Sequence, residues 1–236
     1  MKQRTLKLQR IYKEGSAYLE SRQIPDAQID AWYLLEYVTG ISRASYYGNP
    51  EKNISEEEAK RYWEYLEKRA RRIPLQHITG SQEFMGLDFK VNEDVLIPRQ
   101  DTELLVENAI TYIKSVKGNV DVLDMCTGSG CIIISVKKFV QTAECTGADI
   151  SEKALETALK NADLNNVPVS FIKSDMFSAL NPEKQYNVIV SNPPYIPSQV
   201  IEGLEPEVKD HEPRMALDGE PDGLKFYRIL AEEGKK

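Results

Sequence analysis

The chain has 236 residues, 41% of them hydrophobic and 28% charged, enough for one large or two modest hydrophobic cores. Its formal net charge of −7 argues against duplex nucleic acid as a direct partner, because phosphate contacts demand a basic surface. It lacks both an apolar run near the roughly 18 residues of a membrane span and a signal-type segment after Met1, which predicts a cytoplasmic enzyme with no membrane partner.

Residues 1–75 have the apolar spacing of a small helical bundle. Ser55 and Glu58 have the spacing of a capping box, in which each residue satisfies a free backbone group of the other. Trp32 and Trp63 keep helical spacing with their apolar neighbours, so we expect them in the core rather than in contact with a ligand.

A compact basic cluster, Lys68-Arg-Ala-Arg-Arg72, lies at the end of the last predicted helix of the bundle. The charge of a helix C-terminus favours cations. We therefore interpret the cluster as a solvated helix end rather than as a contact for nucleic acid.

Residues 76–97 predict a β-hairpin linker. Leu87, Phe89 and Val91 follow Gly86 and alternate with polar residues, as in a half-buried strand. A helix is expected from Asp101, and strands near residues 120, 145, 170 and 188 then alternate with helices. That order predicts an α/β domain over residues 98–236 with a doubly wound, Rossmann-like parallel sheet and a ligand site at the carboxyl ends of its strands.

A glycine-rich turn follows the first of these strands, where Gly128-Ser-Gly130 comes just after Val120-Asp-Val-Leu-Asp124. Glycines allow the backbone to approach a ligand closely. Asp149 closes the next strand about 20 residues later, where a carboxylate can hold ribose hydroxyls. Because Cys-Ile-Ile follows Gly130, the turn departs from the G-x-G-x-x-G pattern, which favours S-adenosylmethionine over a nicotinamide cofactor.

Asn192-Pro193-Pro194-Tyr195 follows the apolar run near residue 188. A planar NH2 group is a poor nucleophile, because its lone pair is delocalised. The Asn192 side-chain oxygen and the Pro193 carbonyl can accept its two N–H bonds and favour a localised lone pair, while Tyr195 offers an aromatic face. A strand followed by a simple Pro-Pro turn is the structural alternative.

Together these motifs resemble the class I methyltransferases that modify the glutamine of a Gly-Gly-Gln motif in peptide chain release factors. The resemblance covers nearly the whole chain. It includes Pro74–Gly80, Phe84–Phe89, Ile97–Glu103, Ser174–Phe177, Glu212–Leu217 and Asp222–Leu224.

The resemblance implies transfer of a methyl group from S-adenosylmethionine to the glutamine side-chain nitrogen, giving S-adenosylhomocysteine, with no metal ion. Asn192, Pro193 and Tyr195 would be catalytic, and Asn192-Pro193-Pro194-Tyr195 would bind the glutamine. Asp175 and Met176 would lie beside the adenine. The cofactor set that it implies comprises Cys126, Thr127, Gly128, Ser129, Gly130, Asp149, Asp175, Met176 and Asn192. The helical bundle and the hairpin would bind the release factor away from the reacting glutamine.

Some residues have two interpretations. Asp124 either supports the glycine-rich loop or caps a chain end. Arg99, Asp101 and Glu103 either order the opening of the active site or form a helix N-terminus, and we assign them a structural role first. The family usually has glycine at Cys126, where we expect only the backbone to matter.

Cys126, Cys131 and Cys145 have no metal-ligand spacing and are expected to be reduced, buried residues. His77 and His211 give little support for a metal site or a nucleophile-base pair.

Two other functions remain open. An adenine N6-methyltransferase would use the same Asn192 chemistry on nucleic acid, and a non-catalytic protein would keep the fold and bind release factor. Family members usually continue beyond Lys236 with another helix and a strand pair, so we expect a C-terminally truncated chain.

Overall fold

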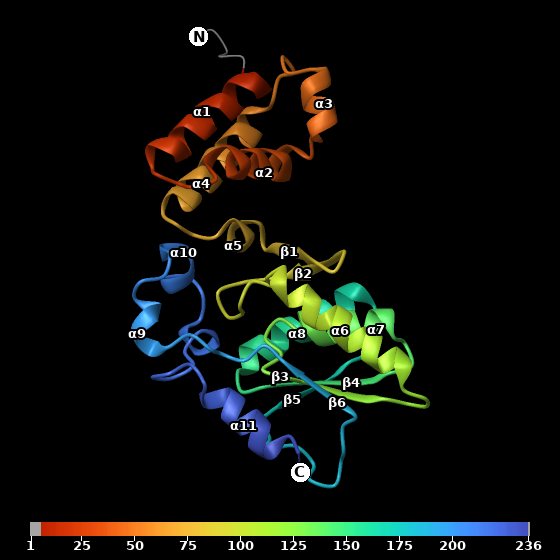
Figure 1. Ribbon diagram of the computed structural model, residues 1–236. Helices are drawn as coiled ribbons and strands as arrows, with labels where there is room; N and C mark the ends of the chain where they lie inside the picture. Colours follow the sequence, from red (N-terminus) through yellow and green to blue (C-terminus); the bar gives the residue numbers. More distant parts are fainter. Residues whose placement is uncertain (1–5, 236) are drawn as a thin grey trace. The chain divides into compact units, whose positions relative to one another are not determined.

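The computed structural model describes residues 6–235 (Figure 1). Its contacts divide the chain into two compact units, one up to Thr79 and one from Gly80 onward. No helix among the described residues combines the length and the apolar content that crossing a membrane requires.

The first unit is helical. Its elements are α1 (Leu8–Ser21), α2 (Ala27–Thr39), α3 (Arg43–Gly48), α4 (Glu56–Ala70) and α5 (Leu75–Thr79). The capping box predicted at the start of α4 is confirmed, since Ser55 Oγ accepts from the Glu58 N–H and Glu58 accepts from the Ser55 N–H.

Aromatic side chains fill the core of this unit, as the periodicity predicts. Trp32 is buried and contacts Tyr46 edge to face, with ring centroids 5.2 Å apart. Trp63 is only half-buried and packs edge to face on Tyr18. Such pairs add about 0.5–1.5 kcal/mol beyond the burial of their area.

The basic cluster at the end of α4 differs from the expectation of a solvated helix end. Arg69 is buried, and its Nε donates to Asp30 Oδ2 on α2 at 2.6 Å. A charge removed from water needs a partner, and the periodicity of α4 turns Arg69 toward α2 because it lies three residues after Leu66.

The second unit begins with the predicted hairpin. Strands β1 (Ser81–Phe84) and β2 (Leu87–Lys90) pair antiparallel. Met85 and Gly86 make the two-residue turn, both with positive φ, which suits the right-handed twist of the strands. The Glu103 side chain accepts from the Met85 N–H at 2.6 Å, so the carboxylate holds this turn.

A four-stranded parallel sheet follows and confirms the predicted doubly wound α/β fold. Its strands are β3 (Asp121–Met125), β4 (Glu144–Asp149), β5 (Ser170–Lys173) and β6 (Val188–Ser191), in the order β5-β4-β3-β6. The helical segments of this unit are α6 (Asp101–Ser115), α7 (Cys131–Phe139), α8 (Glu152–Asn165), α9 (Ser198–Ile201), α10 (Pro206–Lys209), η1 (Arg214–Ala216) and α11 (Lys225–Glu233).

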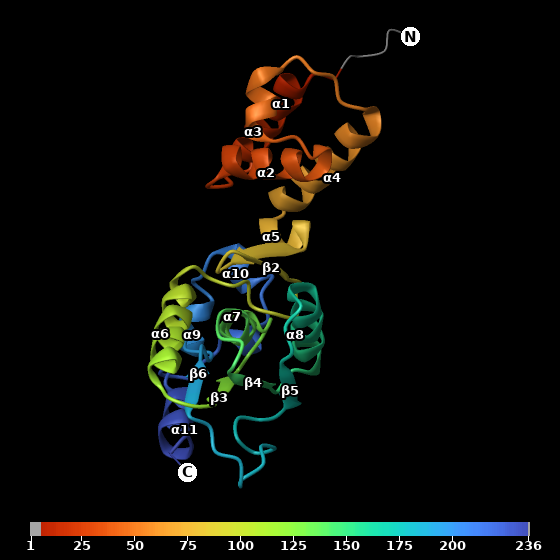
Figure 2. The ribbon, with the colours of Figure 1, turned by 90° about the vertical axis from the view of Figure 1, so that its right-hand side faces the viewer.

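Helices cover both faces of the sheet. Figure 2 shows α6, α7 and α8 side by side over one face, where they enclose a core that includes Val106, Ile133 and Ala162. On the other face Leu123 and Met125 pack with the apolar side of α11. The chain runs outward from β3 to β5 and then returns to β6 on the other side of β3, so strand order reverses beside β3. Ligand sites of open α/β sheets form at such a reversal.

Candidate active site

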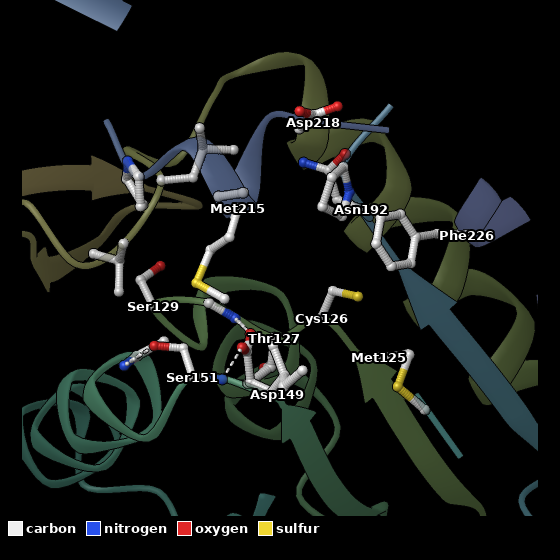
Figure 3. Close-up of a pocket in the computed structure, with 18 of the residues that line it drawn as sticks. Met125, Cys126, Thr127, Ser129, Asp149, Ser151, Asn192, Met215, Asp218 and Phe226 are labelled. Atoms are coloured by element: carbon white, nitrogen blue, oxygen red, sulfur yellow. Dashed lines mark hydrogen bonds between the residues drawn. The ribbon is translucent and has the colours of Figure 1, made fainter. Parts of the chain in front are cut away.

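A cavity of about 630 Å³ opens where the turn after β3, the end of β4 and the segment after β6 meet (Figure 3). This volume is within the range of about 300–1,000 Å³ that small-molecule sites occupy. The predicted cofactor residues that line the cavity are Cys126, Thr127, Gly128, Ser129, Asp149, Asp175, Met176 and Asn192.

The turn after β3 is built from left-handed backbone conformations. Cys126, Gly128 and Gly130 have φ values of 62°, 55° and 79°. A left-handed conformation strains a residue that has a Cβ, which gives a physical reason for glycine at the position of Cys126 in the resembling family. The cysteine is half-buried rather than buried, and burial raises the pKa of its thiol to about 12.

Gly130, which was predicted to bind the cofactor, is not among the residues that line the cavity. A Cβ there would lie 2.8 Å from Ile134 Cδ1 and 3.1 Å from Ala158 Cβ. The absence of a side chain therefore allows α7 and α8 to pack closely. Gly128 differs, since a Cβ on it would meet nothing within 4 Å.

Asp149 is fixed at the carboxyl end of β4. Its Oδ2 accepts from the Gly128 N–H at 2.8 Å, and its Oδ1 accepts from the Ser151 N–H at 2.9 Å. Burial raises the pKa of this carboxyl, while these backbone donors oppose the rise. Each oxygen keeps a lone pair beyond these bonds, so the carboxylate can accept from hydroxyl groups of a ligand.

Asp124 supports the glycine-rich turn, which decides between its two interpretations. Its Oδ2 accepts from Thr127 Oγ1 at 2.6 Å, and its Oδ1 is buried with no hydrogen-bond donor among the described residues. Burial raises the pKa of Asp124 to about 7, and the nearby Asp149 charge adds to the rise.

This raised pKa predicts a pH dependence of stability. Folded Asp124 binds a proton that the unfolded chain has already released above its ordinary pKa of 3.8. The free energy of unfolding should therefore fall as pH rises from about 4 to about 7, by up to about 1.4 kcal/mol per pH unit from this group. Urea unfolding at pH 5 and pH 7 measures the effect. An equal pH slope in Asp124→Asn would contradict it.

Asn192 follows β6 and lines both the large cavity and a second cavity of about 300 Å³. The other residues of the predicted motif are distributed around it. Pro194 lines the large cavity and Tyr195 lines the second one, whereas Pro193 is buried and lines neither cavity. The neighbouring Ser191 donates to the Met125 carbonyl at 2.6 Å, which ties the end of β6 to the end of β3.

Residues 217–223 hold the Asn-Pro-Pro-Tyr segment from outside. The Ile196 N–H donates to the Leu217 carbonyl, and the Gly219 N–H donates back to the Ile196 carbonyl, each at 2.9 Å. Ser198 Oγ donates to Asp218 Oδ1 at 2.6 Å. Gly223 approaches so closely that a Cβ on it would lie 2.3 Å from the Tyr195 carbonyl oxygen.

Gly223→Ala should therefore displace the Asn-Pro-Pro-Tyr segment and lower kcat at least about tenfold, as small misplacements of a site do. Gly118→Ala is the matched control, because Gly118 also has positive φ but a Cβ there would meet nothing within 4 Å. That control should cost about 1 kcal/mol of stability at unchanged kcat. Equal kcat values for the two variants would rule out a clamping role.

Ile150, Met215 and Phe226 are among the cavity residues that the sequence prediction missed. Ile150 is 49% exposed beside Asp149, and Met215 and Phe226 come from η1 and α11. Figure 3 shows Met215 reaching down toward Thr127, and Phe226 beside Asn192. Ile150 could have been predicted from the sequence, because it is an apolar residue directly after the acid that ends the strand. No local sequence pattern indicated Met215 or Phe226, since only the return of the chain over the sheet brings them to the cavity.

A parallel sheet with a glycine-rich turn after β3, a fixed carboxylate after β4 and Asn-Pro-Pro-Tyr after β6 defines an S-adenosylmethionine-dependent methyltransferase. Family models agree with this class. The PrmC N-terminal domain matches residues 10–80, and the methyltransferase small domain matches residues 100–203.

Relatives define the family. The release factor glutamine methyltransferase of Geobacter sulfurreducens is 40% identical over 213 residues, 90% of this chain and 74% of that protein. The enzyme of the same name from Caulobacter vibrioides is 38% identical over 232 residues, 97% of this chain and 79% of that protein. The chain belongs to the release factor glutamine methyltransferase family.

The described residues fit S-adenosylmethionine. Asp149 presents carboxylate oxygens suited to ribose hydroxyls, and the exposed Ile150 offers an apolar surface suited to adenine. Gly128 leaves open space in front of its backbone. Among residues 6–235 no group of three or more His, Cys, Asp or Glu side chains is arranged to hold a metal ion.

Proposed function

We propose that this chain methylates the side-chain amide nitrogen of the Gly-Gly-Gln glutamine in peptide chain release factors, and that Asn192 is the residue that orients this nitrogen. The observation that carries the proposal is the position of Asn192, whose side chain lines both cavities. A group bound in the second cavity would therefore lie beside a residue that also lines the cofactor cavity.

The chemistry requires little beyond orientation. S-adenosylmethionine, when bound, supplies a methyl group on a positively charged sulfur. The Asn192 side-chain oxygen and the Pro193 carbonyl accept the two N–H bonds of the glutamine, which favours a lone pair directed at the methyl carbon. The new C–N bond forms as the C–S bond breaks, and the nitrogen then releases one proton to water. Orientation of this kind is worth about 7–11 kcal/mol.

Tyr195 is proposed to pack its ring against the flat amide. Its side chain is 54% exposed and lines the second cavity, so it lies on the acceptor side of Asn192. Asp175 and Met176, which line the large cavity, are proposed to lie beside the adenine. The buried Pro193 contributes its backbone carbonyl alone.

The helical unit is proposed to bind the release factor away from the reacting glutamine. It has its own closed core, and every residue that lines either cavity belongs to the second unit. Ile29, Tyr33 and Tyr37 recur every four residues on α2 and are each 47–49% exposed. Amide hydrogen exchange of α2 with and without release factor tests this role. The cytoplasm, where translation ends, is the proposed place of action.

Transfer of labelled methyl to three acceptors tests the function. The acceptors are purified release factor, its Gln→Ala version in the Gly-Gly-Gln loop, and an adenine-containing duplex. Label on unmodified release factor alone is the expected result. Label on the duplex would move the chain to the adenine methyltransferases, and no label despite cofactor binding would leave a binding protein without transfer activity.

A further inference from the structure

The second cavity lies next to the cofactor cavity and shares part of its wall. Leu96, Arg99, Thr102, Asn192 and Ala216 line both. The residues that line the second cavity alone include none from the glycine-rich turn and none from the end of β4. It therefore lies outside the part of the site that holds a nucleoside and opens toward Asn192 from the acceptor side.

Its lining suits a stretch of uncharged peptide. Leu105, Val208 and Leu217 give it aliphatic walls, and Arg99 and Asp101 place a donor group and an acceptor group at the same cavity. A peptide unit carries one N–H donor and one carbonyl acceptor, and both need partners when they leave water. The small residues beside the acceptor glutamine leave these backbone groups accessible.

Arg99 is held by a buried carboxylate. Its Nη2 donates to Glu212 Oε1 at 2.7 Å, while the Glu212 side chain is only 1% exposed and that of Arg99 is 43% exposed. A guanidinium has five N–H donors, and within residues 6–235 the Glu212 carboxylate is the hydrogen-bond acceptor of Arg99. Because Arg99 also lines both cavities, its other N–H groups are available to a ligand there.

Glu212 lines neither of the two cavities. Its Oε2 is buried with no hydrogen-bond partner in the described part of the chain, and burial raises its pKa although Arg99 opposes the rise. A carboxylate kept in such surroundings needs its cation, and the cation is in turn restrained by the carboxylate. This arrangement limits the rotamers of Arg99 and directs its free N–H groups.

We propose that the second cavity binds the backbone of the acceptor loop beside the glutamine, that Arg99 binds a peptide carbonyl there, and that Glu212 positions Arg99. The proposal rests on the proposed function, because it deepens the account of the same acceptor. Loss of Arg99 should therefore lower the affinity for release factor and leave the affinity for the cofactor unchanged.

The test measures release factor and cofactor separately. Equilibrium binding of release factor is measured with S-adenosylhomocysteine present, and cofactor affinity is measured by calorimetry. Arg99→Ala should raise the Kd and KM for release factor about tenfold, the effect of one charge-assisted hydrogen bond, at unchanged kcat and cofactor affinity. Arg99→Lys, which keeps the charge beside Glu212, should fold and show a smaller increase.

A double-mutant cycle tests the positioning role. Glu212→Gln should raise the Kd for release factor in the natural background and add nothing in the Arg99→Ala background, because its effect passes through Arg99. Lys184→Ala is the matched control, since Lys184 pairs with Asp121 at 3.3 Å near the opposite ends of the strands. This control should leave both affinities unchanged.

The measurements distinguish failure of the role of Arg99 from failure of the proposed methyl transfer. A parallel loss of cofactor affinity in Arg99→Ala would assign Arg99 to the cofactor carboxylate and overturn the proposal, as would an unchanged Kd for release factor. Additive effects of the two substitutions would overturn the role of Glu212. Absence of methyl transfer by the unsubstituted protein would refute the proposed function instead, and the binding measurements would still decide the place of Arg99.

Discussion

Asn192→Ala is expected to lower kcat about 10²–10³-fold, the usual cost of removing one preorganised group that stabilises a transition state. The substitution removes the acceptor that orients the glutamine nitrogen and leaves the Asp149 contacts intact. Cofactor affinity should therefore change less than about threefold, well below the cost of a lost charged hydrogen bond. Methyl transfer kinetics and calorimetry with S-adenosylhomocysteine measure the two quantities.

The same strand offers a matched control. Asn187 precedes β6 at its opposite end, where its Oδ1 accepts from the Asp121 N–H at 2.8 Å. Asn187→Ala removes the same side chain from the other edge of the sheet, so it should lower stability and leave kcat unchanged. If Asn192→Ala lost cofactor affinity and kcat by the same factor, Asn192 would be a wall of the cofactor cavity rather than an orienting group.

Asp149→Ala is expected to weaken cofactor binding about 100-fold or more, since hydrogen bonds to a charged group contribute about 1.5–3 kcal/mol each. The loss has two parts. The ribose hydroxyls lose their acceptor, and the N–H groups of Gly128 and Ser151 lose the oxygens that hold the turn in place. Calorimetry with S-adenosylhomocysteine measures the dissociation constant directly.

Two further variants separate these parts. Asp149→Asn keeps one acceptor oxygen but turns an NH2 group toward one of the two backbone N–H donors. Its affinity for S-adenosylhomocysteine should therefore lie between that of the unsubstituted protein and that of Asp149→Ala. Asp163→Ala, an exposed acid on α8, should leave affinity unchanged. If Asp149→Ala lost stability but bound the cofactor as tightly as the unsubstituted protein, Asp149 would stabilise the turn without binding the cofactor.

Much of the fold could be predicted because the local signals agree. Four apolar runs near residues 120, 145, 170 and 188 became β3 to β6, and Ser55 with Glu58 became a capping box. Strand periodicity and capping depend on residues close together in the chain, and no distant segment contradicts them here. The roles of the two units in binding release factor stay predictions.

The positions of the candidate site residues were predictable where those residues lie at the ends of strands. Asp149 ends β4 and Asn192 directly follows β6, and parallel strands bring their carboxyl ends to one edge of the sheet. Gly130 also has a packing role that its spacing did not reveal, because glycine serves close backbone packing as readily as ligand approach. Arg69 was misplaced because its partner Asp30 lies 39 residues away.

The sequence by itself determined the order of elements, the class of cofactor and the residues that end the strands, because these follow from periodicity and from motifs within a few residues of one another. Only the tertiary structure decided how Gly223 closes on Tyr195, how Met215 returns over the cofactor cavity, and how buried Glu212 holds Arg99 from 113 residues away. Such contacts join residues that are far apart in the sequence. They depend on how the chain crosses the sheet and returns, which no local sequence pattern predicts.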